Sequence, residues 1–404
     1  MNAEAMKSYL LQPLAPLVVR SGRPFDDQAG ADAARFPPPS TLAGALRSAL
    51  ADTRGEAYSA ALLEVPVRGP LPARLSASGQ PGSLLVPRPA DALCFWSADK
   101  RSKRLVRAAP AAFAAGEGAD LPAGLLPVRL VEPVRGKPAP APAWWALEDF
   151  LRFRCGESLD MQAIAERVAE NGWTPNCIDP RTHVAIDPSR QAAANGKLFQ
   201  TTGMEFIQRV KSRQHDTIGE GALSESLRPI GLFGSIAGDI APGVIPLGGE
   251  RRLSAIGAAD ESLWPEADAA AFDAITAAGG VVLSLLTPAL FAEGWQPGWL
   301  QPAGLGQKGY LEGTPPGCEG VTLRLRAAAL DRWQPHSGWD LAARQPRAGR
   351  KLVPAGAAYW FEIIAGDGAA LRPLWLGSVC DGEQDRRDGF GLALIHPWSP
   401  MSGD

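Results

Sequence analysis

Two arginines stand shortly before the predicted start of a helix near the N-terminus. Arg20 and Arg23 lie in a loop that ends with the prolines of residues 37–39, and Ser40 or Thr41 can then cap a helix. The free amides and the dipole of a helix N-terminus attract phosphate oxygens, and guanidinium groups would add to that attraction. These residues predict an anion site, although a basic loop before an ordinary packing helix would have the same sequence.

A second basic segment extends over residues 181–213, which contain six Lys or Arg and two acidic residues. The alternation of side-chain types around His183 predicts a β-hairpin over about 181–201, with a polar loop over 188–196 at its tip. A locally basic hairpin in a chain of net charge -3 indicates an anionic partner at this place.

Three residues of this hairpin have the types that bind single-stranded nucleic acid. Arg190 and Lys197 would neutralise phosphates, and Phe199 would stack on a base. That pair of interactions is what sequence-tolerant binding of a single strand requires. A solvent-exposed hairpin whose Phe packs on the core is the alternative.

Adjacent glycines precede a pair of arginines later in the chain. Gly248 and Gly249 allow the backbone to approach a ligand closely, and Arg251 and Arg252 would bind its phosphates. An ion pair between Glu250 and one of these arginines inside the fold is the alternative.

Two further basic clusters have no acidic residue among them. Residues 100–107 contain five Lys or Arg. This cluster is either a solvated basic face or a contact with RNA. Arg350 and Lys351 close a group of four positive charges that also contains Arg344 and Arg347.

No catalytic, metal-binding or cofactor-binding pattern emerges. The glycines of residues 304–309 match the dinucleotide-binding pattern by letter, but prolines replace the strand and helix that the pattern needs, so we expect no cofactor. The four histidines and five cysteines have no metal-ligand spacing, and we expect no metal and no enzymatic activity.

The composition predicts the elements that must position these residues. A chain of 404 residues, 46% apolar with 44 glycines and 37 prolines, is typical of two β-rich mixed domains. Residues 9–19 read as an edge or bulged strand because Pro13 and Pro16 remove ladder donors, and an amphipathic helix should begin near Thr41. Later strands are predicted over the following ranges: 281–286, 357–364, 371–379 and 392–395.

Two features bear on the location of the protein. The N-terminus lacks a basic region followed by an apolar core, and no apolar stretch is long enough to cross a bilayer, so we expect a cytoplasmic protein without a membrane partner. Residues 110–143 are rich in Ala and Pro and predict a surface excursion.

The order of these motifs resembles the RAMP superfamily of CRISPR-associated RNA-binding proteins, and within it the family of the third subunit of the Cmr complex, the type III-B effector. The motifs that carry the resemblance are residues 13–25, 36–47, 183–187 with 198–199, 246–253, 338–340, 353–356 and 389–391. They span nearly the whole chain. The glycine loop at 389–391 is shorter than the glycine-rich loop common among RAMP proteins.

The resemblance implies an α+β fold of two ferredoxin-like (RRM-like) domains, over residues 1–225 and 226–404, with the 181–201 hairpin as a protruding thumb. It implies a non-catalytic subunit that binds the 5′ repeat-derived tag of CRISPR RNA (crRNA) and docks the large polymerase/cyclase-type subunit. A backbone subunit and the target RNA would lie nearby. The RNA-binding candidates are Arg20, Arg23, His183, Arg190, Lys197, Phe199, Arg251, Arg252, Arg350 and Lys351.

Two other functions are compatible with the sequence. Some RAMP relatives cut RNA without a metal, and His183 would be the acid–base residue of such an endoribonuclease. A carbohydrate-binding β-protein could use some of the 12 tryptophans as platforms for sugars.

Overall fold

The chain divides into two compact units, each built from three separate segments. Unit 1 comprises Met1–Leu84, Trp173–Leu263 and Pro335–Arg350, and unit 2 comprises Leu85–Gly172, Trp264–Gln334 and Lys351–Asp404. The computed structural model describes residues 5–19, 34–76, 78–97, 102–155, 160–213, 223–304, 309–340 and 345–401. It describes the backbone alone at 195–197, 199, 211–213, 223–225, 339–340 and 346.

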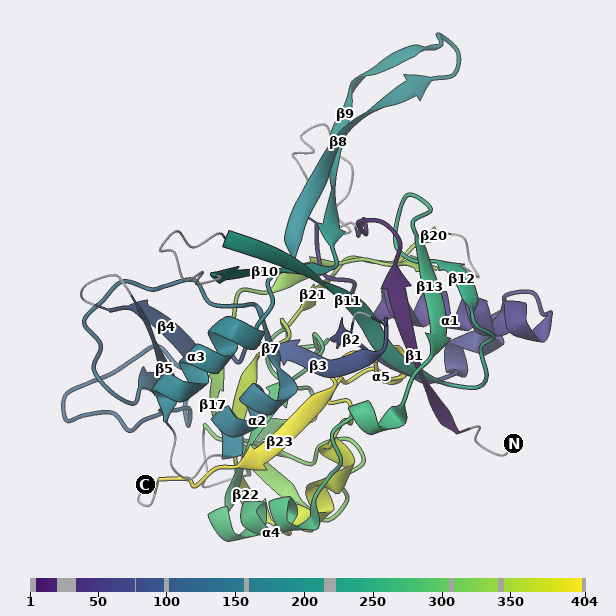
Figure 1. Ribbon diagram of the computed structural model, residues 1–404. Coiled ribbons are helices and arrows are strands. Elements are labelled where there is room, and N and C mark those ends of the chain that lie inside the picture. The colour runs from purple at the N-terminus through teal and green to yellow at the C-terminus, as the bar shows by residue number, and fades with distance from the viewer. Residues whose placement is uncertain are drawn as a thin grey trace. The chain divides into compact units, whose positions relative to one another are not determined.

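Unit 1 is an antiparallel sheet with one long helix on it and a projecting hairpin (Figure 1). The sheet order is β12-β13-β1-β11-β2-β3, and β10 also pairs with β11. The elements of this unit are β1 (Met6–Pro13), α1 (Pro39–Arg54), η1 (Ala60–Glu64), β2 (Val67–Leu75), β8 (Asn176–Asp187), β9 (Ala192–Glu205), β10 (Ile207–Arg213), β11 (Leu223–Ala237), β12 (Gly243–Pro246), β13 (Leu253–Ala258), η2 (Glu261–Leu263), β19 (Trp339–Asp340) and β20 (Gln345–Pro346). Three further strands contain the points where the chain passes between the units, and these are β3 (Pro81–Pro87), β18 (Gln334–His336) and β21 (Arg350–Leu352).

The first strand is not an edge strand, so that prediction is wrong. β1 pairs with β11 on one side and with β13 on the other. Pro13 is its last residue and Pro16 lies beyond it, so the missing amides fall at and after the end of the ladder.

The predicted amphipathic helix is present as α1, whose Leu42, Leu46 and Leu50 are fully buried. It begins at Pro39, and the residue before it, Pro38, offers no side-chain cap, so the predicted capping by Ser40 or Thr41 is wrong. Proline suits the first turn because the amide it lacks would have no partner there. Helix and sheet approach closely because β11 has a glycine at 234, where a Cβ would lie 2.5 Å from Leu42 Cδ2.

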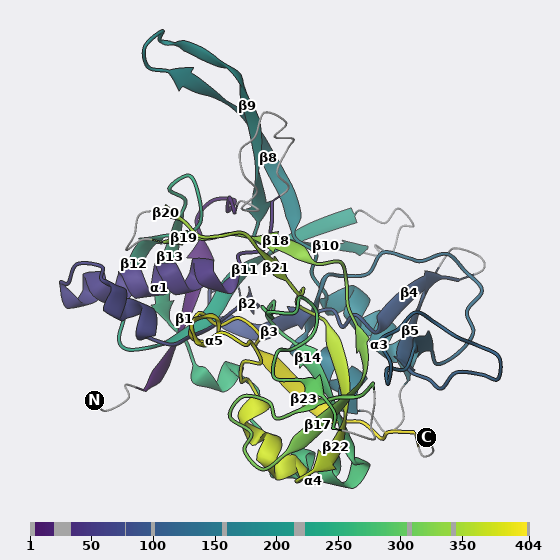
Figure 2. The same cartoon turned by 180° about the vertical axis from the view of Figure 1, so that it is seen from behind.

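Unit 2 contains a larger antiparallel sheet and a smaller one (Figure 2). The larger sheet has the order β15-β16-β17-β22-β14-β23, and the smaller has the order β4-β5-β6. The elements are β4 (Ala92–Trp96), β5 (Lys103–Pro110), β6 (Val128–Leu130), β7 (Trp144–Ala146), α2 (Leu147–Cys155), α3 (Met161–Asn171), α4 (Ala269–Ala278), β14 (Gly280–Leu285), β15 (Gln301–Pro302), β16 (Leu311–Gly313), β17 (Thr322–Ala329), β22 (Ala358–Ala365), η3 (Gly368–Leu374), α5 (Glu383–Arg387) and β23 (Ala393–Pro397).

The larger sheet buries both of its faces. On one face Val281 and Phe361 pack with Phe272 of α4 in the main core of the unit. On the other face Val282 and Trp360 form a second cluster. The strands predicted over 281–286, 357–364 and 392–395 are confirmed as β14, β22 and β23. Residues 371–379 do not form the predicted strand, because 368–374 are the short helix η3.

The Ala- and Pro-rich residues 110–143 are largely exposed, as predicted. Part of this segment packs nevertheless. Val128 in β6 lies against the second cluster of the larger sheet, and Leu126 N donates to Arg326 O at 2.7 Å. The excursion therefore covers apolar surface of its own unit.

The fold is thus mixed α+β with antiparallel sheets, as predicted. None of the helices in the described ranges is long and apolar enough to span a membrane.

Candidate nucleic-acid interface

The predicted hairpin is present and projects from the sheet of unit 1 (Figures 1 and 2). β8 and β9 pair antiparallel, with His183 opposite Phe199 and Arg181 opposite Thr201. The tip is shorter than the predicted 188–196 loop, because the turn occupies 188–191 and β9 already begins at Ala192.

The tip turn is held by one aspartate. Asp187 Oδ1 accepts from Ser189 N at 2.9 Å and from Ser189 Oγ at 2.7 Å, and these bonds hold the pKa of Asp187 below its usual value. The side chain of Arg190 is 79% exposed beside it, with its Nε 4.0 Å from Asp187. The tip therefore presents a guanidinium group to solvent.

A short extended segment joins the base of the hairpin to the loop between β12 and β13. Leu17 and Met204 of β9 exchange two backbone hydrogen bonds of 2.9 and 2.8 Å, and Gly249 N donates to Val18 O at 2.7 Å. Gly248 has φ of 78°, and a Cβ there would lie 2.8 Å from Val18 O. The paired glycines thus bring the loop against this segment, which is a structural use for them.

The loop turns sharply through two residues with positive φ. Arg252 N donates to Gly249 O at 3.3 Å, and Glu250 and Arg251 have φ of 57° and 53°. These are the features of a type I′ turn, in which the two central residues are left-handed. The side chain of Arg251 is exposed at this turn.

Glu250 reaches from this turn to the hairpin. Thr201 Oγ1 donates to Glu250 Oε1 at 3.0 Å, and His183 Nε2 lies 2.8 Å from Thr201 Oγ1 and 3.3 Å from Glu250 Oε1. Because the single hydroxyl proton of Thr201 goes to Glu250, Nε2 of His183 must carry a proton and donate to Thr201 Oγ1. The carboxylate, hydroxyl and imidazole therefore form one connected chain across the hairpin base.

Arg252 extends this network along β8 to Asp179. Its Nη2 lies 3.5 Å from Asp179 Oδ2 and 3.8 Å from Glu250 Oε2, and its side chain is 13% exposed. Asp179 also accepts from Arg181 at 2.7 Å, and these arginines, Arg181 above all, hold the pKa of Asp179 below its usual value. Asp179 lies in an irregularity of the β8 ladder between Ile178 and Arg181 and has φ of 58°.

The structure brings three of the predicted residues together and leaves the others apart or undescribed. His183 and Arg252 both contact Glu250 at the hairpin base, Arg251 is the next residue of the same turn, and Arg190 lies at the tip of the hairpin. The ion pair of Glu250 with Arg252, expected as the alternative to phosphate binding, is present, so Arg252 is engaged within the fold.

The remaining predicted residues fall into three groups. Arg20 and Arg23 lie outside the described residues. Lys197 and Phe199 belong to β9, and only their backbone is described. Arg350 and Lys351 belong to β21 and are exposed, and Lys351 Nζ lies 5.2 Å from the ring of Trp333, itself 53% exposed.

Sequence reasoning missed Asp179 and Thr201 and gave Glu250 only a structural alternative. No spacing in the sequence connects them, because they come from two strands and a distant turn. One signal was present in the sequence, namely Glu250 and Arg251 directly after Gly248 and Gly249. A tight turn at this place has two bulky residues at its centre, where Asn and Gly are usual, and this indicates a role for their side chains.

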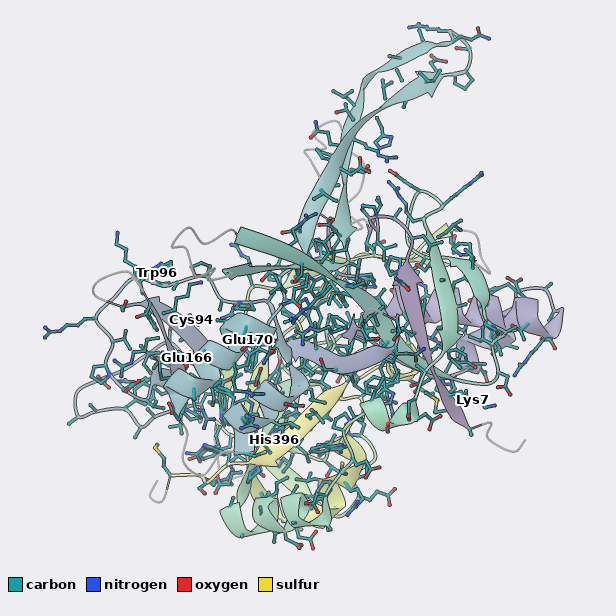
Figure 3. The ribbon with its side chains drawn as sticks, in the orientation of Figure 1. Lys7, Cys94, Trp96, Glu166, Glu170 and His396 are labelled. Carbon is teal, nitrogen blue, oxygen red and sulfur yellow. The ribbon has the colours of Figure 1, made fainter. Side chains whose placement is uncertain are left out.

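His396 is a buried histidine of the larger sheet in unit 2 and is not a candidate acid–base residue. It belongs to β23, where Figure 3 labels it, and its side chain is buried against Phe150. Burial, with a smaller contribution from Arg154, lowers the pKa of His396 to about 3. The group is therefore neutral near pH 7.

Several of the described tryptophans that were considered as sugar platforms are inside the protein. Those that are buried are Trp144, Trp145, Trp173, Trp264 and Trp360. A buried indole offers no face to a sugar.

Comparison with known proteins assigns the family. The family described as CRISPR-associated protein (Cas_Cmr3) matches residues 9–398. The chain belongs to this family. The family match includes the hairpin, the Gly248-Gly249 loop and both units, which confirms the resemblance drawn from the motifs.

Two solved chains are similar to this Cas_Cmr3 family member at low sequence identity. One comes from a cryo-EM structure of the type III-B Cmr-beta complex bound to cognate target RNA and AMPPnP, with 13% identity and a TM-score of 0.43. The other comes from the same kind of complex bound to cognate target RNA, with 13% identity and a TM-score of 0.42. Each match covers 88% of this chain and 86% of the solved chain. No curated protein matches the chain.

Proposed function

We propose that this protein is a non-catalytic RNA-binding subunit of a type III-B CRISPR (Cmr) interference complex, and that it binds the 5′ repeat-derived tag of crRNA. Membership of the Cas_Cmr3 family supports the complex. The observation that carries the RNA contact is the set of exposed cations on the hairpin and on the turn at its base, in a chain of net charge -3. These are Arg181, Arg190 and Arg251.

The three cations differ in how strongly acidic side chains of the protein already engage them. Arg181 shares Asp179 with Arg252, and Arg190 has only a 4.0 Å contact with Asp187. Arg251 has no acidic partner among the described residues. In this proposal Arg190 and Arg251 neutralise phosphates, while Phe199 stacks on a displaced base and hydrogen bonds to base edges select the tag.

The rest of the proposal concerns the partners and the domains. The subunit would dock the large polymerase/cyclase-type subunit and lie beside a backbone subunit, close to the target RNA. The two ferredoxin-like domains over 1–225 and 226–404, with the hairpin as thumb, belong to the same proposal, as does contact of Arg20, Arg23, Lys197, Arg350 and Lys351 with RNA.

The affinity for repeat-tag RNA is expected to fall with salt. With about four phosphate contacts, the logarithm of the association constant should fall with the logarithm of salt concentration at a slope of roughly -3, at about -0.7 per single-strand contact. Fluorescence anisotropy with a labelled tag RNA over a salt series measures this slope. Replacing Arg251 by Ala should make the slope less steep by about 0.7.

A matched control for this measurement is Arg129→Ala. Arg129 is also exposed, but it forms an ion pair with Glu117 at 2.5 Å in the Ala- and Pro-rich segment. Its replacement should leave the slope unchanged. An affinity that does not depend on salt would contradict the proposed function, and equal slopes for Arg251→Ala and the unmodified protein would remove Arg251 from the interface.

Endoribonuclease activity is the second candidate, and the contact of His183 with Glu250 is the observation that favours it. An imidazole beside a carboxylate is a usual acid–base pair. Here, however, Thr201 and Glu250 already occupy Nε2 of this ring. We expect the pure protein to leave repeat RNA intact in the presence of a chelator. Specific cleavage that His183→Ala abolishes would establish the enzyme instead.

A further inference from the structure

Left-handed backbone gathers at the hairpin and the turn that holds it. Within the described residues, five non-glycine residues have positive φ, and four of them belong to this region. Asp179 and Gln191 lie in the hairpin, and Glu250 and Arg251 form the centre of the turn. Left-handed backbone is unfavourable for residues with a Cβ, and such residues cluster where function requires them.

The turn sequence departs from the one that stability alone would select. Type I′ turns favour Asn-Gly at the two central positions, because both residues tolerate positive φ. This chain has Glu250-Arg251 there. The unfavourable backbone at these two positions indicates a role for their side chains.

The side chain of Glu250 spans the distance between this turn and the hairpin. Glu250 accepts from Thr201 at 3.0 Å, lies 3.3 Å from His183, and lies 3.8 Å from Arg252. It thereby contacts both strands of the hairpin, since His183 belongs to β8 and Thr201 to β9. The side chain of Glu250 is only 18% exposed, so it faces the hairpin rather than solvent.

We propose that Glu250 is a positioning residue that fixes the base of the β8–β9 hairpin on the β12–β13 turn, so that the hairpin meets RNA in one direction with Arg190 at its tip. The unfavourable backbone at Glu250 and Arg251 is the cost of this arrangement. The proposal rests on the proposed function, because it concerns the same RNA site. It adds an acidic residue that acts on RNA through the hairpin and touches no phosphate itself.

An electrostatic role and a positioning role of Glu250 predict opposite effects on RNA affinity when its carboxylate is removed. If Glu250 were only a charge near the RNA, its removal would strengthen binding, because the site would become more positive. If it positions the hairpin, its removal weakens binding, because the hairpin must then be ordered when RNA binds. The sign of the effect on RNA affinity therefore separates the two roles.

Glu250→Asn is the decisive variant. Asn suits the left-handed position but is too short to reach Thr201, so the turn is relieved while the contact is lost. We expect an RNA affinity about tenfold lower, as for one loop that must be ordered on binding. The melting temperature should not fall by more than a few degrees, because relief of the turn offsets the lost contacts.

Two companion variants complete the experiment. Glu250→Gln keeps the length and can still accept from Thr201, so it should restore most of the affinity that Asn loses. Asp187→Asn also removes one negative charge near the proposed RNA site, and the Asn oxygen can still accept from Ser189. The RNA affinity of this variant should therefore equal or exceed that of the unmodified protein. Hydrogen exchange of the β8 and β9 amides should be faster in Glu250→Asn and unchanged in Asp187→Asn.

Several results would overturn the proposal. These are an RNA affinity of Glu250→Asn equal to or above that of the unmodified protein, an equal loss in Glu250→Gln, or unchanged exchange in β8 and β9. If the unmodified protein bound no RNA at all, the proposed function would fail by itself. The exchange rates would then still decide whether Glu250 fixes the hairpin.

Discussion

Replacing Asp91 by Asn is expected to lower the free energy of unfolding by about 3–5 kcal/mol, because it leaves a buried guanidinium group without its counter-charge. Arg154 donates from Nη1 to Asp91 Oδ2 at 2.6 Å and from Nη2 to Asp91 Oδ1 at 2.8 Å. The two side chains are 3% and 1% exposed. Asn has one acceptor in place of two, and its amide group would face a donor.

The surroundings make this loss larger than that of an isolated pair. The Cζ atoms of Arg107 and Arg154 lie 4.5 and 5.2 Å from the ring of Phe153. Burial, and then the neighbouring Arg154, lower the pKa of Arg107, and Asp91 opposes this effect. Asp91 therefore balances two guanidinium groups inside unit 2, and its neutralisation leaves both unbalanced.

Urea unfolding followed by tryptophan fluorescence measures this effect, since Trp145 packs on Phe153 at 5.6 Å in the same core. We expect a lower midpoint with an unchanged slope. Glu117→Gln is the control, because it breaks the exposed pair with Arg129 and should change the midpoint far less. Adding Arg154→Met to Asp91→Asn should recover part of the loss, because it removes the unpaired charge. A midpoint of Asp91→Asn equal to that of the unmodified protein would contradict the prediction.

Strong local patterns in the sequence predicted their elements correctly. Leu42, Leu46 and Leu50 have helical spacing and are buried in α1. The continuous apolar run at 281–286 forms β14, an interior strand of the larger sheet that is buried along its whole length. The helical period of the leucines indicates the helix, and the short continuous run with β-branched Val281 and Val282 before Pro288 indicates the strand.

The prediction failed where a short apolar segment had two possible periods. Residues 371–379 contain apolar residues that fit a strand, but Leu371 and Leu374 are both fully buried at a spacing of three, which is the period of a 3₁₀ helix. Asp367 accepts from Ala370 N at 3.1 Å and caps that helix. The aspartate before the segment was the local signal that distinguished the two.

The basic residues of the candidate site could be predicted from the sequence, but the roles of its acidic residues could not. Arg190, Arg251 and Arg252 were found because clustered charge is visible in the sequence. The roles of Asp179 and Glu250 in the site were not, because the contacts that define them join distant residues: Asp179 and Arg252 are separated by 73 positions, and Thr201 and Glu250 by 49. Only the register of β8 with β9 and the place of the β12–β13 turn bring these groups together.

Replacing Phe199 by Ala is expected to weaken binding of tag RNA by about 1–3 kcal/mol, which is the usual cost of losing one base stacked on an aromatic ring. Phe199 pairs in register with His183, on the part of the hairpin that Glu250 fixes at its base. Its place on the projecting hairpin, and not its type alone, supports the stacking role. Anisotropy titration of labelled tag RNA at fixed salt measures the loss.

The neighbouring residue offers a control that separates stacking from general apolar contact. Leu198 is 62% exposed on the same strand, but an aliphatic side chain has no π-face for a base. Leu198→Ala should therefore change RNA affinity much less than Phe199→Ala, and Phe199→Trp should keep most of the affinity. If Phe199→Ala folds and binds RNA like the unmodified protein, Phe199 belongs to the core of the hairpin base. The RNA contact would then depend on the cations alone, and its affinity should vanish at high salt.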